Sequence, residues 1–185
     1  MSATSTFLIA NVIGGLAVLG GYLICLYSFP AQREMLWGNI HGGLRYSFTV
    51  SMLLAAAGYL TFAYGVFFES NPTEFSSRLL NTKHAMSILC MIFLLSSASW
   101  MPATIIYLKT RKTIWWIISV MSLWITAISL FTATVIVISS PLAISSTSYR
   151  ILTISGISVI TYHCLVPVSY THLRAHETDS YLVCR

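Results

Sequence analysis

The stretch IWWIISVMSLWITAISLFTATVIVISS, residues 114–140, contains no Lys, Arg, Asp or Glu. A bilayer core of about 30 Å is crossed by about 20 apolar residues that rise 1.5 Å each in a helix. Four further stretches have the same character, and they are residues 7–29, 46–68, 85–108 and a shorter one from 151 to about 168. Because charged groups are costly at mid-membrane, this pattern predicts an all-α integral membrane helical bundle with four clear transmembrane helices and a shorter fifth.

Composition leads to the same fold class. The chain of 185 residues is 56% hydrophobic and 8% charged, whereas soluble domains average about 45–50% and 25%. The formal net charge of +5 comes from Lys and Arg scattered between apolar stretches rather than from a basic run. We therefore expect membrane lipids as the partners of residues 1–167, and no nucleic acid.

Short connections between the spans predict an up-down order in which sequential helices are antiparallel neighbours. Arg33 and Arg45 lie in the first connection, and the third is the basic turn at residues 109–113. The opposite side has fewer basic residues, so the positive-inside rule places the N-terminus outside or in a lumen. Interfacial cations also meet lipid headgroups, and the candidates for this contact are Arg45, Lys109, Arg111 and Lys112.

Two spans carry stripes of small or hydroxyl side chains at helical spacing. Small residues let helix backbones approach closely, and hydroxyls can bond to a neighbouring helix or to their own preceding turn. The predicted packing residues are Ala10, Gly14, Ala17 and Gly21 in the first span and Ser119, Ser122, Thr126 and Ser129 in the fourth. These faces favour contact with other helices, either within the chain or on another membrane subunit.

Histidine is the residue type with the most functional potential in the spans. His41 precedes the second span and His163 lies in the fifth, both toward the same predicted side. Facing imidazoles at such positions can ligate a haem or relay protons, so these two residues are the candidates for cofactor binding. No zinc-type spacing of Cys and His occurs, so we expect no metal site and no resident cofactor.

The terminal stretch VSYTHLRAHETDSYLVCR, residues 168–185, differs in composition from everything before it and contains Asp179, the single Asp of the chain. Its words SYTHLRAHET and LVCR closely resemble translated sequencing-adapter read-through, which is excluded from fold reasoning. The alternative is a genuine polar tail. Under the first interpretation the native chain continues beyond about Pro167, and five spans is a minimum.

Catalytic motifs such as G-x-S-x-G, H-E-x-x-H or a P-loop are not found in the chain. The sequence therefore favours a non-catalytic membrane component or complex subunit. A carrier or hydrophobic-ligand binder that uses the hydroxyl-rich fourth span and a third span kinked at Pro102 is the alternative. A haem-binding redox protein is the third hypothesis.

Overall fold

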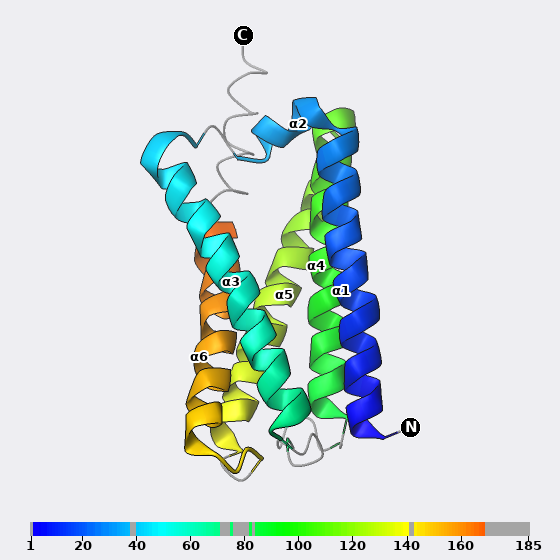
Figure 1. The fold of residues 1–185 in the computed structure, drawn as a ribbon. Helices are drawn as coiled ribbons and strands as arrows, with labels where there is room; N and C mark the ends of the chain where they lie inside the picture. Colours follow the sequence, from blue (N-terminus) through cyan, green and yellow to red (C-terminus); the bar gives the residue numbers. More distant parts are fainter. Residues whose placement is uncertain are drawn as a thin grey trace.

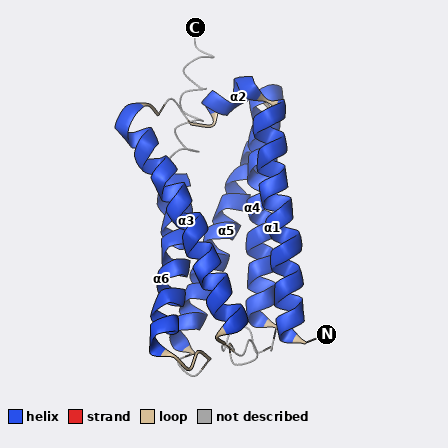
Figure 2. Ribbon diagram, viewed as in Figure 1, coloured by secondary structure: helices blue, strands red, loops and turns tan. Residues whose placement is uncertain are grey.

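The structure is a computed structural model that describes residues 2–37, 40–70, 75, 82, 84–140 and 143–168, without the side chains of residues 33, 34, 167 and 168. In these residues every regular element is helical, which confirms the predicted all-α class (Figures 1 and 2). The elements are α1 (Ala3–Ser28), α2 (Pro30–Met35), α3 (Gly42–Phe68), α4 (Ala85–Thr110), α5 (Thr113–Ser139), α6 (Thr147–His163) and the π-helical turn η2 (Cys164–Val168).

Five of these helices are long and apolar enough to cross a membrane, and they cover the five predicted stretches. Local signals set their ends. Ser2 caps α1 by accepting a hydrogen bond from the Ser5 amide at 3.0 Å. Arg111 adopts a left-handed backbone (φ 55°) that ends α4, and only Lys112 separates it from the start of α5.

The spatial order of the helices differs from their order in the chain. α4 packs on both α1 and α5, α6 packs on α3, and α5 joins the two groups through α6. Two sequential pairs, α1 with α3 and α3 with α4, touch only slightly, so the prediction that all sequential helices are close neighbours is wrong for these pairs. For α1 and α3 the reason is their connection, because residues 30–45 include α2 and are long enough to reach a more distant position (Figure 1).

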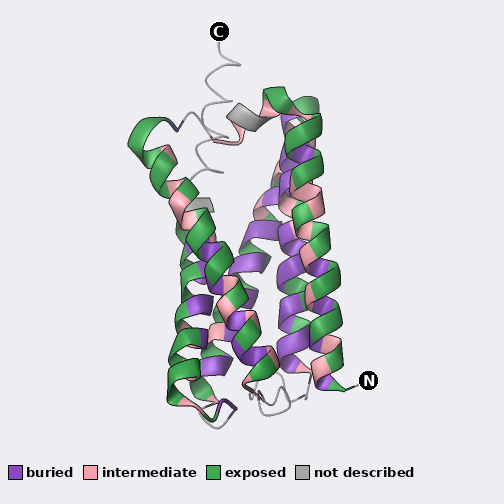
Figure 3. Ribbon diagram, in the orientation of Figure 1, coloured by how far each residue is buried: buried purple, intermediate pink, exposed green. Residues whose placement is uncertain are grey.

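Burial identifies α4 and α5 as the centre of the bundle. In the most apolar window of each helix, 56% of α4 and 50% of α5 is buried, against 17% of α1 (Figure 3). The outer faces of the bundle instead carry large exposed side chains such as Leu16, Leu23, Leu53 and Leu60. A surface of this kind is stable in contact with acyl chains rather than with water.

The main core occupies one end of the bundle. Its buried members include Phe7 of α1, Phe62 of α3, Met86 of α4 and Ile157 of α6. At the other end a smaller cluster of Cys25, Met101 and Ile105 joins α1 and α4, and Leu36 after α2 packs against it. Within α3, burial begins at Ala55, so residues 42–54 lie outside both clusters.

Candidate functional site

Hydroxyl groups hold α4 against α5. The Ser96 and Thr126 hydroxyl oxygens lie 2.8 Å apart, and those of Thr104 and Ser119 lie 2.6 Å apart. Ser119 also donates to the Trp100 carbonyl oxygen of α4 at 3.1 Å. All of these side chains except that of Trp100 are buried. Interhelical hydrogen bonds therefore account for two of the four hydroxyl residues predicted on the fourth span.

The remaining two of those residues bond within α5 itself. Ser122 donates to the Ile118 carbonyl at 2.8 Å and Ser129 to the Thr126 carbonyl at 2.9 Å. Both are nevertheless buried. Their small size, rather than a bond to another helix, is what they contribute to the packing.

The small-residue stripe of α1 faces α4, with one exception. A Cβ added to Gly14 would lie 2.7 Å from the Leu94 Cβ, so the two helices meet closely there. Ala10 is buried beside this contact, and a Cβ on Gly21 would lie 4.0 Å from the Ala98 carbonyl oxygen. Ala17 is exposed, although its helical spacing places it on the same face as the other three.

The Ala98 carbonyl has lost its ordinary helical donor, because residue 102 is proline and has no N–H. The α4 helix nevertheless continues through Pro102 to Thr110. Two residues after Ala98, the Trp100 indole donates to the Tyr22 hydroxyl at 2.7 Å, and the two rings meet edge to face. This bond fixes α1 on α4 near the smaller cluster.

A polar contact also links α1 to α3. The Tyr59 hydroxyl donates to the Asn11 side-chain oxygen, and the Asn11 amide donates to the Phe7 carbonyl at 2.7 Å. The Tyr59 ring lies 5.3 Å from the Phe93 ring of α4, centroid to centroid. Tyr59 is thus the point at which α3 meets the α1 and α4 pair.

His163 is buried and its Nδ1 lies 2.8 Å from the Ser51 hydroxyl oxygen, which joins α6 to α3. His41 is instead exposed at the start of α3, ten residues before Ser51. At a rise of 1.5 Å per residue the two levels differ by about 15 Å along α3. The structure therefore does not bring His41 and His163 together as ligands of one haem.

The closest helix approach in this region was not predicted from the sequence. Gly58 of α3 crosses Gly156 of α6, and a Cβ added to Gly58 would lie 2.6 Å from the Gly156 carbonyl oxygen. About two turns along α3, a Cβ on Gly65 would overlap the Thr153 hydroxyl. The spacings Gly58-x₆-Gly65 and Thr153-x₂-Gly156 could have marked these two helix faces as packing faces, although not as partners of each other.

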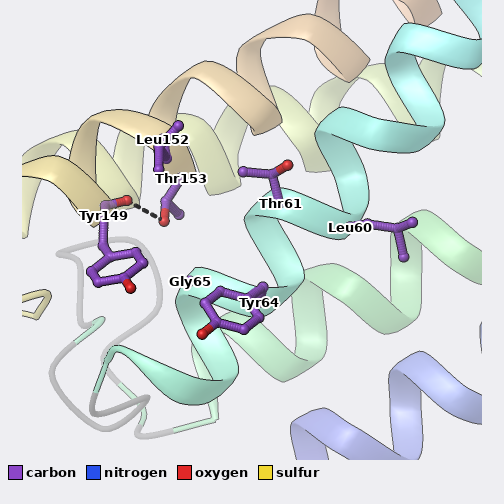
Figure 4. A pocket seen from close by; sticks show the side chains of 7 residues that line it. All are labelled: Leu60, Thr61, Tyr64, Gly65, Tyr149, Leu152 and Thr153. Carbon is purple, nitrogen blue, oxygen red and sulfur yellow. Dashed lines mark hydrogen bonds between the residues drawn. The ribbon is translucent and has the colours of Figure 1, made fainter.

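Two shallow grooves lie along the α3 and α6 pair. The first has a volume of about 420 Å³ and is lined by Leu60, Thr61, Tyr64, Gly65, Tyr149, Leu152 and Thr153 (Figure 4). The Tyr64 and Tyr149 rings stand 6.2 Å apart at its edge. The second, of about 440 Å³, is lined by Ser47, Val50, Ser51, Leu54, Ser158, Val159 and Tyr162. Both are mainly apolar grooves with a few hydroxyl groups.

Cations gather at the end of the bundle that carries α2. The Lys109 ammonium lies 3.7 Å from the centroid of the Phe29 ring, and the Arg45 guanidinium lies 4.8 Å from that of Trp37. Arg111 and Lys112 form the turn between α4 and α5 at the same end. The four predicted headgroup residues thus share one end of the molecule.

Among the described residues, no group of three His, Cys, Asp or Glu side chains could hold a metal ion. The predicted read-through at residues 168–185 lies outside the described residues except for the Val168 backbone. Comparison with known proteins finds no matching family model, no matching curated protein and no matching solved structure.

Proposed function

We propose that the chain is a multi-pass integral membrane protein that acts as a non-catalytic membrane component, such as a subunit of a membrane complex. The five long apolar helices and the exposed leucines on their outer faces support insertion in a bilayer. In this proposal the helices alternate in direction across the membrane. The cations at the α2 end support a cytoplasmic location for that end and an N-terminus outside or in a lumen.

The observation that carries the non-catalytic assignment is the use of the polar side chains inside the helices. Each of the main helix pairs has an interhelical hydrogen bond, such as Ser96 with Thr126 for α4 and α5 or Ser51 with His163 for α3 and α6. For α5 and α6 the bond joins Thr134 and Thr161 at 3.3 Å. Side chains used in this way hold helices in register, which is the role of polar residues in membrane bundles.

Crosslinking in native membranes tests the subunit role. An amine-reactive or photoactivated crosslinker should shift the chain from monomer mass to one or more larger discrete species. Detergent-solubilised protein, diluted before crosslinking, is the control for random collision. A single species at monomer mass in native membranes would contradict the proposal.

A hydrophobic-ligand binder is the second candidate, and the groove between Tyr64 and Tyr149 favours it. A photoactivatable fatty-acid probe should then label peptides that line this groove. Leu152→Trp would fill the groove and reduce labelling, whereas Leu16→Trp on the outer face of α1 would not. Equal labelling of all exposed helix faces would rule out this second candidate.

A further inference from the structure

At the cationic end of the bundle, two contacts hold the Lys109 ammonium in a defined position. Lys109 lies in the last turn of α4, where a cation is favoured by the helix dipole, and its ammonium rests on the Phe29 ring at the end of α1. These two contacts hold the Lys109 ammonium at the junction of α1 and α4. An anion that binds to an ammonium group already held in place loses less entropy than one that binds to a freely moving lysine.

Lys112 stands three residues away, directly before α5, and α5 has no acidic residue in its first turn. Among the described side chains the one carboxylate is Glu69, which follows α3 at the opposite end of the bundle. The described part of the chain therefore offers no carboxylate to neutralise Lys109 and Lys112. With no described carboxylate beside them, the two ammonium groups would attract an anion from outside the chain.

Further aromatic residues lie at the same end of the bundle as these two cations. Trp115 and Trp116 begin α5, and Tyr27 at the end of α1 is 90% exposed. Tryptophan and tyrosine gather at the level of lipid headgroups, and long apolar helix faces continue directly below them. The anion that fits this level best is one attached to acyl chains, which would lie along these apolar faces.

We propose that Lys109 and Lys112 select anionic glycerophospholipids, whose headgroup meets the two ammonium groups while the acyl chains lie along the outer faces of α1, α4 and α5. This inference rests on the proposed insertion of the helices in a bilayer. The attraction is electrostatic, so each lysine contributes about a fivefold preference for an anionic over a zwitterionic lipid at low salt. The preference falls as salt screens the charges.

Tryptophan quenching by brominated lipids tests this selectivity. The full chain is reconstituted in phosphatidylcholine vesicles that contain either brominated phosphatidylglycerol or brominated phosphatidylcholine. Phosphatidylglycerol should quench several-fold more strongly per molecule, and molar salt should abolish the difference. Equal quenching by the two lipids would overturn the selectivity, while quenching by neither would overturn bilayer insertion itself.

Variants assign the effect to the two lysines. Lys109→Gln with Lys112→Gln should remove most of the preference, and Lys109→Arg with Lys112→Arg should keep it. Arg150→Gln, which removes one positive charge at the opposite end, is the matched control and should leave the preference unchanged. A wild-type preference in the double Gln variant would overturn the assignment, as would a preference that inorganic phosphate abolishes at an ionic strength where chloride does not.

Discussion

Gly58 and Gly156 bring the backbones of α3 and α6 into direct contact, since a Cβ on Gly58 would lie only 2.6 Å from the Gly156 carbonyl oxygen. No bulkier residue fits between these helices without moving one of them. The contact lies between the two grooves of this pair and fixes how closely α3 and α6 approach. The packing of α3 depends on this contact, because α6 is the helix on which α3 mainly packs.

The first prediction concerns this crossing. Gly58→Ala should lower the free energy of unfolding by about 1–3 kcal/mol, because the added methyl group forces two backbones apart. Gly20→Ala is the matched control, since nothing lies within 4 Å of its added Cβ. That control should be neutral or stabilising by at most about 1 kcal/mol through helix propensity. Unfolding in mixed micelles measures both, and equal stability of the two variants would contradict the close crossing.

The second prediction concerns the hydroxyl contact between α4 and α5. Thr126→Val keeps the shape of the side chain but removes its bond to Ser96, which should cost about 0.6 kcal/mol and at most about 1.7 kcal/mol. Thr132→Val is the control, because Thr132 is only half-buried and its hydroxyl donates within its own helix, to the Ile128 carbonyl. A double-mutant cycle with Ser96→Ala isolates the pair energy. Zero coupling between residues 96 and 126 would show that the contact does not stabilise the bundle.

The third prediction tests the contact between α3 and α6, which the sequence did not predict. Gly65→Cys with Thr153→Cys should form a disulfide between α3 and α6, because the added Cβ of residue 65 would lie 3.1 Å from that of residue 153. The mean Cβ–Cβ distance in disulfides is about 3.8 Å, so only a small shift of the two helices is needed. The background replaces the native cysteines by alanine, and they are Cys25, Cys90, Cys164 and Cys184.

A second pair in the same background serves as the control for that experiment. Leu16→Cys with Leu53→Cys places two exposed residues on α1 and α3, which touch only slightly. This pair should stay reduced under the mild oxidation that links residues 65 and 153. If the disulfide between α1 and α3 formed faster, α3 would lie beside α1 rather than beside α6, and the arrangement described here would be wrong.

The fourth prediction concerns orientation. In the cysteine-free background, Ser2→Cys should react with a membrane-impermeant maleimide on intact cells, since the N-terminal end is proposed to face outward. Lys112→Cys at the opposite end should react only after the membrane is opened. The reverse pattern would mean that the cationic end does not face the cytoplasm.

Much of the fold follows from local patterns in the sequence. Uncharged apolar runs locate all five long helices, and the left-handed residue at Arg111 lies in the basic turn that separates the third run from the fourth. The hydroxyls of Ser119 and Thr126 could likewise be assigned to helix packing from their spacing alone. Each of these features depends on residues close together in the chain.

Helix adjacency could not be predicted in the same way. Small residues occur on several faces, so nothing in the sequence says that Gly58 pairs with Gly156 rather than with Gly14. Likewise, His163 and Ser51 are separated by 112 positions, and only the three-dimensional packing makes them partners. These contacts depend on the shapes of two surfaces together, which a pattern within one helix does not contain.

Membrane partition is the most direct measurement of the central claim, that the five apolar helices lie in a bilayer. After alkaline carbonate extraction and ultracentrifugation without detergent, the chain should remain in the membrane pellet and float with the vesicles on a density gradient. Recovery of folded, monodisperse protein from the detergent-free supernatant would contradict the account.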